Sequence, residues 1–77
     1  MLAADVVRLE ASFAVRVDDV SSTITYVGEA PIRSPNTAPV WRIKKLETLG
    51  SVFSITWADG NMSFDNVWND RASLSYL

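Results

Sequence analysis

Of the side chains that carry oxygen in ITWADGNMSFDNVWND, residues 55–70, five lie at spacings close to those of a calcium loop: Asp59, Asn61, Ser63, Asp65 and Asp70. An EF-hand loop places its oxygen ligands at positions 1, 3, 5, 7, 9 and 12 and needs glycine at position 6. With Asp59 at position 1, Phe64 occupies the glycine position and the short Asp70 occupies the glutamate position. The preceding SVFSITW alternates like a strand, whereas an EF-hand needs a helix there. These five residues are therefore weak metal candidates, and we assign no metal to the chain.

The dipeptide Asp59-Gly60 explains the same stretch as a turn. Asp-Gly between two apolar runs is a strong signal for a type I′ turn, because both central residues of that turn have positive φ. With this turn, Trp57 faces Met62 and Ile55 faces Phe64, so the apolar residues of both arms share one face. The sequence therefore predicts a hairpin that joins residues 51–58 to residues 61–64.

The segment after this hairpin, NVWNDR, is typical of a short helical turn, which we place at residues 65–71. Asp65 is expected to cap this turn by accepting hydrogen bonds from its first backbone N–H groups. Trp68 is expected to pack back on the sheet. We therefore assign structural roles to Asp59, Gly60, Asp65 and Trp68.

The composition excludes most other chemistry. The chain has no histidine, no cysteine and no glycine-rich phosphate loop, and its serines have no nearby base. We therefore predict no catalytic residue, no cofactor and no enzymatic activity. Nine acidic residues outnumber seven basic ones, and the only basic cluster is WRIKK, residues 41–45. We interpret this cluster as a solvated strand face, and nucleic acid is not an expected partner.

Alternating apolar residues predict a mainly β fold: a small antiparallel sheet, sandwich or barrel-like, of about five strands. Beside the hairpin, strands are expected at 7–17, 22–27, 40–46 and 72–77, with a turn near 18–21. The last of these would carry Ala72, Leu74 and Tyr76 inward. Part of 7–17 also fits a helix, but its valines favour a strand. The first ten residues fit a strand, a helix or a flexible arm, the arm covering residues 1–6.

A loop is predicted between the second and third strands, at residues 28–39. This segment, GEAPIRSPNTAP, holds all three prolines of the chain, and proline removes a donor that the middle of a sheet requires. A loop of this length is either functional or a mobile surface crossover, and the residues do not decide between the two.

The 77 residues correspond to one domain, close to the lower size at which a hydrophobic core alone stabilises a fold. Without disulfides or zinc ligands, such a chain gains further stability from oligomerisation or from a cation held by oxygens. No apolar run is long enough to span a membrane. The N-terminus lacks the basic region of a secretory signal, so we expect synthesis in a host cytoplasm.

Three segments together resemble a family of small proteins encoded by tailed bacteriophages and prophages: TYVGEAP at 25–31, VWRIKKL at 40–46 and ITWADGNMSFDNVWNDRASLSY at 55–76. The loop after Pro31 departs from that pattern, since it is richer in proline. The resemblance implies a virion-associated structural protein without catalytic residues, and other virion proteins as its partners. We expect a structural or adaptor component of the tail, fibre, baseplate or capsid surface that acts as a homo-oligomer. Large aromatic residues dominate interfaces, so Tyr26, Trp41 and Tyr76 are the predicted contact residues.

The alternative is a monomeric binding module. In that case the proline-rich loop and neighbouring exposed aromatic residues would grip a peptide, a glycan or a host protein. The sequence leaves open the position in the particle, the oligomeric state and the partner surface.

Overall fold

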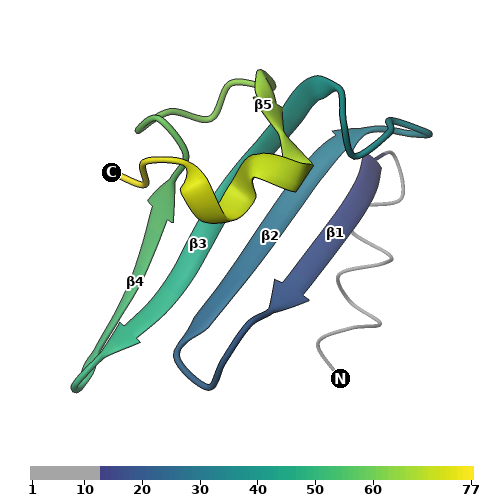
Figure 1. Cartoon of the computed structure of the whole chain (residues 1–77). Coiled ribbons are helices and arrows are strands. Elements are labelled where there is room, and N and C mark those ends of the chain that lie inside the picture. The colour runs from purple at the N-terminus through teal and green to yellow at the C-terminus, as the bar shows by residue number, and fades with distance from the viewer. Residues whose placement is uncertain (1–12) are drawn as a thin grey trace.

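The computed structural model describes residues 13–77 as an antiparallel meander of four strands, with a short fifth strand and one 3-10 helix (Figure 1). The elements, in chain order, are β1 (Phe13–Asp19), β2 (Ile24–Pro31), β3 (Pro39–Leu49), β4 (Val52–Trp57), β5 (Asn66–Val67) and η1 (Trp68–Ser73). The predicted mainly β fold class is confirmed. The expectations for residues 1–12, including the start of the first strand, lie outside the described residues.

The strand order is β1-β2-β3-β4, and β5 pairs with the beginning of β3. The first turn lies at residues 20–23, where Ser21 Oγ accepts hydrogen bonds from the N–H groups of Thr23 and Ile24. The β3–β4 turn is tighter and uses Gly50 at a φ of 61°. Short turns of this kind keep each strand next to its sequence neighbour, so the sheet is built from local hairpins.

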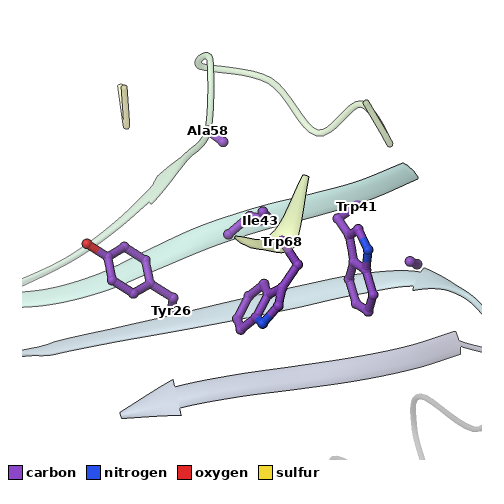
Figure 2. Close-up of a cluster of buried hydrophobic side chains, with 6 residues drawn as sticks. Tyr26, Trp41, Ile43, Ala58 and Trp68 are labelled. Carbon is purple, nitrogen blue, oxygen red and sulfur yellow. The ribbon is translucent and has the colours of Figure 1, made fainter. Parts of the chain in front are cut away.

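The core lies on the face of the sheet that η1 covers. It consists of Tyr26, Ala30, Trp41, Ile43, Ala58 and Trp68. Figure 2 shows the Trp41 and Trp68 rings side by side above the sheet, and their centroids are 5.9 Å apart with the planes tilted by 42°. Within residues 13–77, η1 crosses this face, and the fully buried apolar side chains lie on this side of the sheet.

Gly28 in β2 makes room for this packing. A Cβ atom on Gly28 would lie 2.6 Å from Trp68 Cε3 and 2.7 Å from Trp68 Cζ3. No side chain larger than hydrogen fits there, since real Cβ contacts are longer than this. The glycine therefore lets the indole of Trp68 lie directly on the backbone of the sheet.

The predicted loop at 28–39 is wrong at both ends. Residues 28–31 belong to β2, β3 already begins at Pro39, and the connection covers only 32–38. Pro31 and Pro39 are tolerated because each lies at the end of a strand, where the missing N–H breaks no ladder. Pro31 faces Phe13, and Pro39 faces Val67.

The turn at Asp59-Gly60 forms, with φ values of 60° and 70° and a hydrogen bond from Asn61 N to Ala58 O of 3.4 Å. The predicted pairing of residues 61–64 with β4 is wrong. Within the described residues β4 pairs with β3, and the C-terminal segment takes the positions next to the turn. Asp59 N donates to Ser75 O at 2.7 Å and Leu77 N donates to Trp57 O at 3.1 Å. The hairpin would also have needed Ala58 N, which donates to Ile43 O of β3 at 2.9 Å instead.

The predicted cap and terminal strand also need correction. The N-cap position of η1 is Val67, and no side chain caps it, while Asp65 Oδ1 accepts a hydrogen bond from Asn66 Nδ2 at 3.2 Å. The helical turn covers Trp68–Ser73, later than the predicted 65–71. Residues 72–77 form a single bridge, between Tyr76 and Ala58. Leu74 and Tyr76 pack against the core as expected, but Ala72 is exposed.

We expect Gly28→Ala to lower the free energy of unfolding by about 1–3 kcal/mol, the usual cost of overpacking a core. The physical reason is the overlap of the new methyl group with the Trp68 ring. Urea denaturation of both proteins measures the loss. In a Trp68→Leu background the same alanine should cost less, and an equal cost in both backgrounds would contradict the steric explanation.

Candidate interaction surface

The side of the sheet that faces away from η1 is a second apolar surface. Strand alternation places on this outer face Phe13, Val15, Val17, Val27, Arg42, Lys44, Leu46, Phe53, Ile55 and Trp57. Val17 and Phe53 are each 60% exposed and Ile55 is 52% exposed. Exposed apolar residues that gather on one surface mark interaction sites more often than residues scattered singly.

Arg42 organises the part of the outer face nearest β5. Its Nε donates to Glu29 Oε1 at 2.6 Å, because the two residues face each other across β2 and β3. The guanidinium also lies 4.7 Å from the Phe64 ring centroid. Phe64 in turn stacks on Phe13, with centroids 5.8 Å apart and planes at 11°. These contacts hold the segment after the Asp59-Gly60 turn on the outer face. The charge of Arg42 is balanced by its ion pair with Glu29.

The interface residues predicted from the sequence lie elsewhere. Trp41 is fully buried and its Nε1 donates to Pro35 O at 3.0 Å, while Tyr26 is 9% exposed. The prediction is wrong for these two residues, because both fill the single buried face and leave no surface for a partner. Tyr76 is half-buried and its hydroxyl donates to Arg71 O at 2.8 Å.

The apolar surface residues that the sequence reasoning missed are Val17, Phe53 and Ile55. Their alternation is visible in the sequence, and it places Phe53 and Ile55 on one face of their strand. Alternation divides a strand into two faces without saying which of them meets η1. The signal that could have decided it is Gly28, which shares the Trp41 face and marks where another element approaches closely.

The weak metal candidates act in turns and loops in the structure. Asn61 Oδ1 accepts a hydrogen bond from Ser63 N at 2.9 Å, and Asp59 is the first central residue of the turn. Asp70 lies in η1, and β5 separates it from Asp65 along the chain. Within residues 13–77, no group of three or more acidic side chains lies close enough together to hold a metal ion. The short spacing of these oxygens is therefore accounted for by hydrogen bonds within the loop.

Ion pairs join η1 and the strands. Arg71 Nε donates to Asp18 Oδ2 at 2.9 Å, which ties η1 to the end of β1, and the Arg71 guanidinium lies 4.5 Å from the Trp68 ring centroid. On the same face, Lys45 Nζ lies 3.5 Å from Glu47 Oε1 and 5.4 Å from the Tyr76 ring centroid. These contacts frame the core, whereas Phe53 and Ile55 lie on the opposite face.

Burial raises the pKa of the Tyr76 hydroxyl above its ordinary value of 10.0. The neighbouring Tyr26, whose ring centroid is 5.5 Å away, raises this pKa further, and Arg71 opposes the rise. The protonated hydroxyl is the form that donates to Arg71 O, so the folded state holds this proton more strongly than the unfolded chain does.

Searches against protein families, curated proteins and solved structures find no match to this chain. In the part of the chain that the structure describes, no helix is both long and apolar enough to cross a membrane.

We expect Arg42→Met to lower the free energy of unfolding by about 1.5–3 kcal/mol, the range for a hydrogen bond to a charged group. The variant loses the bond to Glu29 and the contact with Phe64. Lys44→Met, two residues along the same face, serves as the control. It loses the contact of Lys44 with the Trp57 ring, which should lower the free energy of unfolding by under about 1 kcal/mol. Chemical denaturation of both variants measures the difference, and equal losses would contradict the role of Arg42.

We expect Tyr76→Phe to flatten the dependence of stability on alkaline pH. In the wild type, the unfolded chain loses its tyrosine proton above pH 10.0 while the folded state keeps it, so stability falls as the pH rises. Phenylalanine removes this proton and, at neutral pH, costs about 0.5–1.5 kcal/mol for the lost hydrogen bond to Arg71 O. Thermal unfolding between neutral pH and pH values above the tyrosine pKa measures both effects. Parallel profiles for the two proteins would rule out Tyr76 as the source.

Proposed function

We propose that this protein is a structural or adaptor component of a bacteriophage virion, in the tail, fibre, baseplate or capsid surface. It works by packing against other copies of itself and against other virion proteins. The resemblance to small phage proteins supports the virion assignment, and it rests on TYVGEAP, VWRIKKL and ITWADGNMSFDNVWNDRASLSY. In the structure these segments form most of β2, most of β3, and the chain from β4 to the C-terminal bridge.

The observation that carries the proposed mode of action is the apolar outer face. A domain of 77 residues that leaves Val17, Phe53 and Ile55 more than half exposed has apolar area to bury against a partner. Repeated copies in a particle provide that partner at high local concentration. The protein then acts through contact area and needs no reactive group.

The loop at residues 32–38 supports this mode over a monomeric module that grips a ligand with its loop. Three hydrogen bonds anchor the loop to the body of the protein. Trp41 Nε1 donates to Pro35 O at 3.0 Å, and Asn36 accepts at its side chain from Arg16 Nε and at its carbonyl from Asn69 N, both at 3.1 Å. A loop held in this way contributes to the fold, and the carbonyl of Pro35 and the side chain and carbonyl of Asn36 are already in use.

Mass spectrometry of density-purified particles from the phage or induced prophage that encodes the chain tests the proposed function. Peptides of this protein should be enriched in the particles together with the major capsid protein. A phage-encoded cytoplasmic enzyme from the same lysate serves as the control for carry-over. Detection in the lysate, with no enrichment above that control in the particles, would overturn the proposal.

A further inference from the structure

Strand β4 forms one edge of the sheet, on the opposite side from β1 (Figure 1). Among the described residues its ladder partner is β3 alone. The hydrogen bonds around it show which backbone groups face inward: Ala58 N donates to Ile43 O, and Thr48 N donates to Thr23 O, both at 2.9 Å. Because antiparallel ladders alternate, Ser54 and Thr56 face β3, and Phe53 and Ile55 present their N–H and C=O groups to the outside.

The β4 edge carries none of the features that keep natural edges from pairing. Its sequence, VFSITW, has no charge and no proline, and the strand is straight enough to pair with β3 over all six residues. The other edge, β1, is different, since it carries Arg16, Asp18 and Asp19. Edge strands without charge, proline or bulge are templates for another strand.

The C-terminal segment covers only one end of this edge. Leu77 N donates to Trp57 O, and Tyr76 bridges Ala58, so the open part is Val52–Thr56. Val52 and Phe53 lie just after the β3–β4 turn, at the corner of the sheet farthest from the 32–38 loop (Figure 1). An incoming strand therefore has room at Phe53 and Ile55.

We infer that β4 pairs antiparallel with β4 of a second copy, about a two-fold axis at Ser54. This inference rests on the proposed self-association and names the surface that performs it. In this register Phe53 of each copy faces Ile55 of the other. The outward N–H and C=O groups of these two residues then form hydrogen bonds between the copies. The two sheets then continue into one.

The side chains fit the same register. On the outer face the pair of Phe53 with Ile55 occurs twice, an aromatic residue against a β-branched one, which stabilises antiparallel strands. On the other face Val52 meets Thr56, and Ser54 meets its own copy. No charged residue of β4 opposes another, so self-pairing brings no like charges together. The second copy also extends the outer face and places apolar neighbours beside Phe53 and Ile55.

Single cysteines test the register, because the full chain contains none. Residues that face each other in a non-hydrogen-bonded pair have Cα atoms about 4.5 Å apart, which a disulfide spans. Ser54→Cys should therefore form a covalent dimer under mild oxidation, as seen in non-reducing electrophoresis. Thr56→Cys is the control on the same face, since its own copy would lie about 13 Å away. Equal crosslinking of the two variants, or none of Ser54→Cys, would overturn the proposal.

A charged residue placed on the β4 edge tests the pairing without a covalent crosslink. Phe53→Lys should weaken dimerisation of the full chain by about tenfold or more in sedimentation equilibrium. Val17→Lys is the matched control, because Val17 is equally exposed on the same face but lies on β1. Thermal unfolding verifies that both variants fold. Loss of dimer in both variants, or in neither, contradicts pairing through β4.

The outcomes for this inference and for the virion role are separable. A Ser54→Cys crosslink together with absence from particles would leave the β4 pairing intact and remove the virion role. Presence in particles together with unaffected self-association of Phe53→Lys would support the virion role and remove the β4 pairing.

Discussion

The packing of Trp68 on Gly28 and Trp41 is the contact on which the rest of the structure depends. Four strands of this length have two large faces, and among residues 13–77 the element that covers one of them is η1. Trp68 begins η1 and inserts its ring where Gly28 exposes the backbone of β2, next to the indole of Trp41 (Figure 2). The core forms around that point, with Tyr26, Ala30, Ile43 and Ala58.

The consequence of this one-sided core is the apolar outer face. The chain stabilises part of it locally, through the Arg42 contacts with Glu29 and Phe64 and the stacking of Phe64 on Phe13. The β3–β4 hairpin lies beyond that cluster and keeps Phe53 and Ile55 exposed. A chain without cysteine or histidine has no disulfide or zinc–histidine site to compensate. We propose that contact with a second copy supplies the further stability, and a particle would provide such copies.

The sequence pattern predicted those features that depend on residues close together in the chain. The alternation in residues 22–27, 40–46 and 51–58, and in the described part of 7–17, located the four strands β1 to β4, and Asp59-Gly60 located a turn whose two residues have positive φ. The helical turn was found within a few residues, because it needs only a short segment of sequence.

Long-range choices could not be read from the same pattern. Residues 61–64 have the right alternation to pair with β4, but the N–H of Ala58, which that hairpin would use, donates to Ile43 O of the distant strand β3 instead. Tyr26 and Trp41 looked like surface anchors because strand alternation does not say which face η1 covers. Gly28 looked like part of a loop, and its value appears only when Trp68 is placed on it.

Amide hydrogen exchange of the wild-type chain, measured residue by residue at low and high protein concentration, tests whether β4 pairs with a second copy. At low concentration Phe53 and Ile55 should exchange faster than Ser54 and Thr56, because their N–H groups face outward. At high concentration Phe53 and Ile55 should become protected, while the amides of β1 stay unchanged. Protection of Phe53 and Ile55 that does not depend on concentration would contradict the account.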